Sequence, residues 1–368
     1  MRTGVANLPL HYGKAPRWLF SRMVKLAREI TIVIVSEFGP EEMLKRLSDP
    51  FWFQAFGCVL GFDWHSSGLT TTACGALKEG IKDISSDLGL IVAGGKGAAS
   101  RKTPDEIFKT GDTFKVEPSP LIYASRMSAK VDNNALQDGY QLYHHCFIFT
   151  KSGSWAVVQQ GMNENTHYAR RYHWLGEGVK EFVCEPHAAI CCDQKKSALN
   201  MVAQESQTAR ETVTALSREK PDTLVRELKK IQTLSLPSRH EIQGGDINPD
   251  RVGQVLLKTH DRQPEEFSVL LGMPGVGAKT IRALSLIAEL VYGVKPSFRD
   301  PARYSFAHGG KDGHPYPVDR EIYDGSIEIL QKAIEQSKVG RTEKMGAIKR
   351  LAGYTKQNST ANFPAGRR

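Results

Sequence analysis

The chain has 368 residues, of which 40% are hydrophobic and 24% charged, so it is long enough for two domains with a sizeable core. This composition excludes a disordered chain, a collagen-like repeat and a small disulfide-stapled protein. The chain has six cysteines, no signal sequence before Trp18 and no apolar stretch of the ~20 residues that a spanning helix needs. These features predict a cytoplasmic protein that does not enter the membrane.

The formal net charge is +9, and the excess lies at the two ends of the chain. Residues 1–30 carry +5 and residues 338–368 carry +7, which leaves −3 for the residues between them. Two basic ends on a nearly neutral body are expected when the termini contact a polyanion, although a solubilising tail gives the same pattern.

Helices are predicted at the start of the chain. Apolar residues recur at helical spacing within residues 16–62 and again within 66–82, and the aromatic side chains of 51–62 are expected to pack in a core. The glycine-rich segment 88–99 lacks the spacing of a phosphate-binding P-loop, so we expect a flexible loop there.

The periodicity then changes to that of strands. Residues 142–149 and 155–160 are short β-type runs, and the turn residues of 151–154 predict a hairpin between them. Residues 1–195 are therefore predicted to form a mixed α/β domain, with a role in substrate or damage recognition.

From Ser197 onward the pattern is almost wholly helical. Helices are predicted at 197–217, 221–233, 248–260, 264–272, 278–292, 318–337 and 341–352. Residues 196–355 are thus expected to form an all-helical domain, followed by a loose basic tail at 356–368. The predicted fold class is α+β, a mixed α/β N-terminal domain followed by an all-helical one.

The most informative segment joins two of these helices. The helices 264–272 and 278–292 each have an apolar side, and residues 274–277 form a tight turn between them. Gly275 and Gly277 accept positive φ angles and let backbone amide groups approach a ligand. The N-terminus of the next helix adds unsatisfied N–H donors and a partial positive charge. We therefore expect this segment to bind phosphate groups of a nucleic acid without reading its sequence.

The run Gly272-Met-Pro-Gly-Val-Gly277, with its flanking helices, resembles the helix-hairpin-helix motif of many DNA repair enzymes. Its continuation to Thr280 is similar to the hairpin of the endonuclease III-like superfamily of DNA glycosylases. The resemblance implies that the helical domain is a helix-hairpin-helix domain that binds DNA and catalyses the reaction. It also implies DNA contacts at Gly275, Val276, Gly277, Thr280 and Arg282.

The same resemblance implies a catalytic pair. Bifunctional members have a lysine two residues after the second hairpin glycine, which is Lys279 here, and a Val-Asp dipeptide at the start of a later helix, which is Val318-Asp319 here. A carboxylate stabilises the positive charge that builds at C1′ as the base leaves, and a deprotonated amine attacks C1′ to form a Schiff base. An extruded base also needs a pocket with aromatic walls. The candidates for that pocket are Tyr304, Phe306, His314 and Tyr316.

The chain departs from the superfamily pattern in three respects. Lys279 and Asp319 are 40 residues apart, so residues 294–316 would be an insertion, and Asp300 is the alternative carboxylate. The four cysteines of an iron–sulfur cluster are missing, so we expect no cofactor and no metal. The similarity covers only residues 260–335, whereas over its full length the chain resembles an uncharacterised family of thermophilic archaea and bacteria.

Other groups of metal-ligand side chains lie in the first half. Cys184, His187, Cys191 and Cys192 fall within nine residues, but this is not a standard zinc spacing, and buried free thiols are favoured over a metal site. The pair His144-His145 alternates on a predicted strand, so at most one of the two is expected to face a site.

These observations predict a DNA repair enzyme. It would be a monomeric base-excision glycosylase with AP lyase activity, acting on double-stranded DNA that carries an oxidised or deaminated base or an abasic site. Two alternatives stay open. A metal-dependent nuclease would use carboxylates of the N-terminal half, such as Asp63 and Asp138, with the hairpin as a DNA grip. A non-catalytic DNA-binding protein would bind with strong salt dependence and cut nothing.

Overall fold

The structure is a computed structural model that describes residues 15–62, 67–192, 195–234, 247–302 and 320–359. Its first half contains α1 (Arg17–Phe38), α2 (Pro40–Ser48), α3 (Pro50–Leu60), α4 (Gly68–Ile81), α5 (Ser85–Leu88), β1 (Leu90–Lys96), α6 (Ala98–Arg101), α7 (Thr103–Phe114), α8 (Pro118–Lys130), β2 (Leu136–Gln137), β3 (Gln141–Thr150), β4 (Trp155–Asn163), β5 (Tyr168–Leu175) and β6 (Ala189–Cys191). The second half contains β7 (Leu199–Asn200), α9 (Gln207–Leu216), α10 (Pro221–Ile231), α11 (Pro249–Arg262), α12 (Phe267–Gly272), α13 (Ala278–Tyr292), α14 (Arg320–Gln336) and α15 (Arg341–Ser359).

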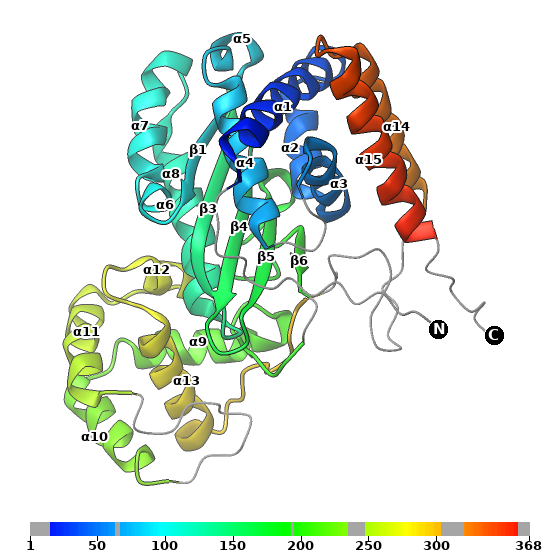
Figure 1. The fold of residues 1–368 in the computed structure, drawn as a ribbon. Helices are drawn as coiled ribbons and strands as arrows, with labels where there is room; N and C mark the ends of the chain where they lie inside the picture. Colours follow the sequence, from blue (N-terminus) through cyan, green and yellow to red (C-terminus); the bar gives the residue numbers. More distant parts are fainter. Residues whose placement is uncertain (1–14, 63–66, 193–194, 235–246, 303–319, 360–368) are drawn as a thin grey trace, which may run out of the picture.

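These elements form two lobes (Figure 1). The sheet lobe consists of the strands, α1–α8, α14 and α15, and the hairpin lobe consists of α9–α13. Helices and strands are mixed, as the predicted α+β class requires.

The main sheet is antiparallel, with the strand order β1-β3-β4-β5-β6. The predicted β3–β4 hairpin is confirmed, and its strands pair from Phe149 opposite Trp155 inward. The strand β3 is apolar on both faces because both are covered. Ile148 faces a core formed with α1–α4, α14 and α15, whereas Phe147 faces a core formed with α7, α8 and the hairpin lobe.

The first helices follow from local sequence signals. Asp49 precedes α3, and its side chain accepts hydrogen bonds from the amides of Phe51 and Trp52, as an N-cap residue does. Trp52 and Phe56 stack with their ring centroids 5.1 Å apart and are fully buried. The predicted aromatic core at 51–62 is therefore confirmed.

The predicted flexible loop at 88–99 is wrong in its centre, because residues 90–96 form the edge strand β1. Gly94 lies opposite Cys146 with a φ of +87°, and a Cβ at this position would collide with the carbonyl oxygen of His145. The glycine thus permits close strand approach in a backbone conformation that other residues rarely adopt.

The helix predicted to begin at Ser197 begins only at Gln207. The preceding residues are held extended, because β7 pairs with β2 and the amide of Asn200 bonds to the carbonyl of Ser297 at 2.9 Å. By contrast, α13 has the predicted bounds, ending before Gly293 in the left-handed region.

The positions of the last two helices differ from the prediction, which placed them in an all-helical domain at 196–355. They leave the hairpin lobe and pack on α1 and α3 (Figure 1), where Leu330 and Leu351 complete the core of the sheet lobe. The cause is that Leu330 and Ile334 of α14 pack in one core with the apolar side of α1, and the periodicity of a single helix does not reveal its packing partner. Among the described residues, no helix has the length and apolarity that crossing a bilayer requires.

Candidate functional site

The hairpin between α12 and α13 has one side buried in the core and one side exposed to solvent. Met273 and Val276 are buried in the core, whereas Pro274 and Gly275 are exposed. Gly275 has a φ of +89°, so its conformation favours glycine. Gly277 is extended, with a φ of −129°, and a Cβ there would meet no atom of the described residues within 4 Å. The tightness of the turn therefore depends on Gly275, while Gly277 leaves open space beside the helix start.

An ammonium group ties this hairpin to the sheet lobe. Lys130, at the end of α8, donates hydrogen bonds from Nζ to the carbonyl oxygens of Leu271 and Met273, both at 2.7 Å, and of Val276 at 3.3 Å. Burial lowers the pKa of Lys130. Because the cation satisfies carbonyls on the inner side, the hairpin has a fixed conformation relative to α8.

The outer side of the hairpin has the properties of an anion site. Among the described residues, no side chain caps the N-terminus of α13 at Gly277, and the first amide groups of a helix have no partner within it. Lys279 is exposed in the first turn of α13. Amide donors, the partial positive charge of the helix start and a lysine side chain thus occur together on an accessible surface.

The five predicted DNA-contacting residues differ in their exposure to solvent. Gly275 is exposed and Gly277 half-buried, but Val276, Thr280 and Arg282 are buried. These three face the core side of the hairpin and α13, and Arg282 donates from Nε to Gln137 at 2.8 Å. DNA contacts by their side chains would therefore require rearrangement, and the backbone near the two glycines remains the predicted contact.

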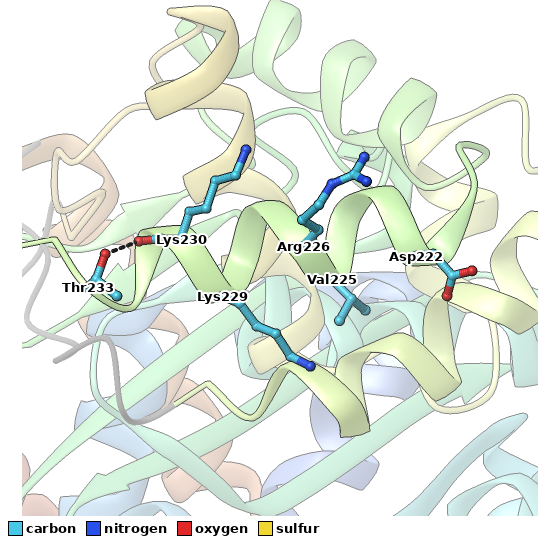
Figure 2. A pocket seen from close by; sticks show the side chains of 6 residues that line it. All are labelled: Asp222, Val225, Arg226, Lys229, Lys230 and Thr233. Atoms are coloured by element: carbon cyan, nitrogen blue, oxygen red, sulfur yellow. Dashed lines mark hydrogen bonds between the residues drawn. The ribbon is translucent and has the colours of Figure 1, made fainter.

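Sequence reasoning missed the basic side chains on α10, a neighbour of α11 and α13. Arg226 and Lys230 point to one side of this helix and Lys229 to the other, around a shallow hollow of about 510 Å³ (Figure 2). Lys230 pairs with Glu227 at 2.9 Å and Lys229 lies 3.4 Å from Asp250, so the positive charge is partly balanced. The available signal was the apolar stripe at 224, 228 and 231, with basic residues at 226, 229 and 230 on the other faces of the same helix.

The predicted catalytic pair is described only in part. Lys279 is exposed, but Asp319 lies outside the described residues, as do the candidate pocket residues Tyr304, Phe306, His314 and Tyr316. The alternative carboxylate, Asp300, is engaged elsewhere, because its two oxygens accept hydrogen bonds from Arg170 at 3.1 and 2.6 Å. It is therefore a structural ion-pair partner.

Arg170 is the centre of this buried ion-pair group. Its guanidinium also binds Asp138 at 2.8 Å and lies over the ring of Tyr140, 4.6 Å from the centroid. Burial raises the pKa of Asp138, and Arg170 and a hydrogen bond from Tyr172 at 2.8 Å oppose that rise. Asp138 is thus committed to Arg170, and Asp63, the other carboxylate suggested for a nuclease, lies outside the described residues.

A second buried network starts at Asp132, in a π-helical turn at Val131–Ala135. Its carboxyl group accepts hydrogen bonds from Gln159 at 2.5 Å and Trp174 at 3.0 Å, and also binds His187. Because Gln159 donates through Nε2, its Oε1 must accept from Nδ1 of His145, at 2.8 Å. Nε2 of His145 is then the acceptor for Ser125, at 2.9 Å.

This network combines a serine with an oriented histidine. Burial lowers the pKa of His145 to about 4, so the ring is neutral at pH 7. Ser125 and His145 border a hollow of about 800 Å³ that extends to Lys130 and Gly272. Ser125 and His145 therefore line the same hollow as Lys130 and Gly272 at the base of the hairpin.

The four clustered metal-ligand residues at 184–192 do not gather at one point. His187 binds Asp132, the thiol of Cys192 contacts the hydroxyl of Tyr140 at 3.2 Å, and Cys191 is buried in the sheet. Instead, Cys74, His144 and Cys146 lie together, with their ligand atoms within 4.8 Å of one another.

The predicted alternation of His144 and His145 is confirmed, because the two rings lie on opposite faces of the sheet. His145 faces the network of Ser125 and Gln159. On the opposite face, burial lowers the pKa of His144 to about 3, and His145 and Lys96 add to the effect.

The fold and these sites define an α+β protein with a surface hairpin and buried polar centres. The chain belongs to the family described as Protein of unknown function (DUF763), which matches residues 4–318. No curated protein and no solved structure matches the chain. Membership in the helix-hairpin-helix glycosylase superfamily is therefore wrong, since no family of that superfamily matches.

Proposed function

We propose that this protein binds duplex DNA through the hairpin and acts on a damaged base or an abasic site, with Lys279 as the nucleophile. The observation that carries the proposal is the exposed surface at the start of α13. There the uncapped helix N-terminus, the open space at Gly277 and the exposed Lys279 adjoin one another. A phosphate bound by the amides would place the neighbouring deoxyribose close to an amine.

The chemistry needs only groups of this chain. The amine of Lys279 forms a bond to C1′ while the bond from C1′ to the base breaks. The base leaves with the electron pair and takes up the proton that the attached amine gives up. The sugar ring opens to a Schiff base, loses a proton from C2′, and expels the 3′ phosphate. A carboxylate near C1′ stabilises the positive charge of the first step, and Asp319 is proposed for that role.

DNA binding is tested with a glycine pair. Gly277 has an extended backbone conformation that alanine also adopts, and the added Cβ lies in open space, so we expect Gly277→Ala to leave the fold unaffected. The new methyl group would stand where a phosphate approaches the helix N-terminus. The matched control is Gly178→Ala, where a Cβ also meets no described atom within 4 Å. We expect Gly277→Ala alone to weaken binding to a duplex, and wild-type binding to fall steeply with salt. Equal affinity of both variants with wild type would overturn the hairpin interface.

Catalysis is tested by borohydride trapping in EDTA on duplexes with an abasic site, uracil or 5-hydroxyuracil. We expect wild type and Lys258→Ala, a change of an exposed lysine on α11, to give a covalent adduct, and Lys279→Ala to give none. Salt-dependent binding with no adduct and no cut on any strand would leave a non-catalytic DNA-binding protein and overturn the lyase. Cutting that requires an added divalent ion would favour the nuclease instead.

A further inference from the structure

A buried cluster on the other face of the sheet has the composition of a metal centre. Cys74 lies on α4, and His144 and Cys146 lie two residues apart on β3, so both strand side chains point to the same face. All three are buried, at 3%, 1% and 2% exposure. Their ligand atoms lie within 4.8 Å of one another, and the two thiols interact.

The imidazole of His144 has no partner for either ring nitrogen among the described residues, although both atoms are buried. The other buried histidines of the sheet are satisfied. His145 contacts Ser125 and Gln159, and His173 contacts the carbonyl of Leu47 at 2.9 Å. Burying a polar group without a hydrogen bond costs free energy, so the unpaired imidazole indicates a bound metal ion that accepts the lone pair of a ring nitrogen.

We propose that Cys74, His144 and Cys146 bind a zinc ion. Zinc–sulfur bonds of about 2.3 Å and zinc–nitrogen bonds of about 2.0 Å give tetrahedral edges of roughly 3.5–3.8 Å. Because the three ligand atoms are already within 4.8 Å, small side-chain rotations bring them onto one ion. Two thiolates and one imidazole match the preference of zinc for sulfur and nitrogen ligands.

The fourth coordination position faces a cavity. The three ligands border the same hollow of about 1300 Å³, which is also lined by Lys78, Lys96 and Tyr143. Lys78 donates to the carbonyl of Gly94 at 2.8 Å and pairs with Glu106 at 2.6 Å. Three protein ligands with an open position define the kind of zinc site that accepts a water or a substrate atom, whereas purely structural sites are closed by four.

The test is the metal content of the full chain, purified with reduced thiols and reconstituted with zinc chloride. We expect about one zinc ion per chain. We expect loss of that zinc in Cys74→Ser, His144→Ala and Cys146→Ser, and its retention in the controls Cys58→Ser and Cys191→Ser, which alter buried cysteines elsewhere. No bound zinc in wild type, or zinc retained without His144, would overturn the site.

A second measurement does not depend on variants that fold. Cobalt in place of zinc should give wild type a thiolate-to-metal charge-transfer band and the visible bands of tetrahedral geometry. Azide, as the probe of the open position, should shift the visible bands. Absence of the charge-transfer band, or a disulfide joining Cys74 and Cys146 in the freshly purified chain, would contradict the metal site. An unchanged spectrum with azide would contradict the open position.

Discussion

Replacing Lys130 with methionine removes the ammonium group that joins the hairpin to the sheet lobe and keeps most of the apolar stem. Two carbonyl oxygens, of Leu271 and Met273, lose charged donors at 2.7 Å, and Val276 loses a longer contact at 3.3 Å. A hydrogen bond to a charged group contributes about 1.5–3 kcal/mol. The site is only half-buried, so water replaces part of the loss, and we expect a destabilisation of roughly 2–4 kcal/mol.

The measurement is unfolding by denaturant, together with hydrogen exchange at the amides of residues 273–278. Arg126→Met is the matched control, because Arg126 is exposed one helical turn before Lys130 on α8. We expect the control to unfold like wild type, while Lys130→Met unfolds earlier, exchanges its hairpin amides faster and binds DNA more weakly. A Lys130→Met variant with wild-type stability and wild-type amide protection would refute the role of the ammonium group.

Three further outcomes follow from the buried groups. Asp300→Asn should destabilise the fold by about 3–5 kcal/mol, because it leaves Arg170 incompletely paired, without abolishing the covalent adduct in the trapping assay; wild-type stability in denaturant would contradict this. Burial lowers the pKa of His173 well below 6.5, so below pH 6.5 the unfolded chain takes up a proton that the folded chain does not. The free energy of unfolding should then fall by about 1.4 kcal/mol from His173 for each unit by which the pH is lowered. Burial also lowers the pKa values of His144 and His145, so His173→Gln should reduce the slope in a denaturation series by about that amount and leave the rest. Gly94→Ala should cost far more stability than Gly97→Ala, since only the first Cβ meets backbone, and equal thermal midpoints would disprove the close strand contact.

The parts of the fold with strong local signals could be predicted. The β3–β4 hairpin and the bounds of α13 depend on period, turn residues and a terminal Gly293, all of which are read within a few positions. The tight turn at 274–277 could be predicted for the same reason, because Gly275, with its φ of +89°, marks it directly.

The parts that depend on distant pairing could not be predicted. Cys74 is separated from His144 by 70 residues, and only the packing of α4 on the sheet brings them together. Arg170 and Asp300, 130 positions apart, meet for a similar reason. The burial of Arg282 depends on which side of α13 faces Gln137, and one helix alone does not specify that.

The return of α14 and α15 to the first helices determines the order in which the chain can become folded. The amide of Lys338 binds the carboxylate of Glu29, 309 residues earlier, so the first helices are synthesised long before their partners. In a domain completed by such distant contacts, the entropy cost of closing the long loop precedes the gain from packing. The apolar surface of the first helices stays exposed until that contact forms. The hairpin lobe lies in the sequence between α1 and α14, so all of its helices are synthesised before α14 and α15. Docking of these two helices on α1 and α3 is therefore the step that ends the exposure of the nascent core.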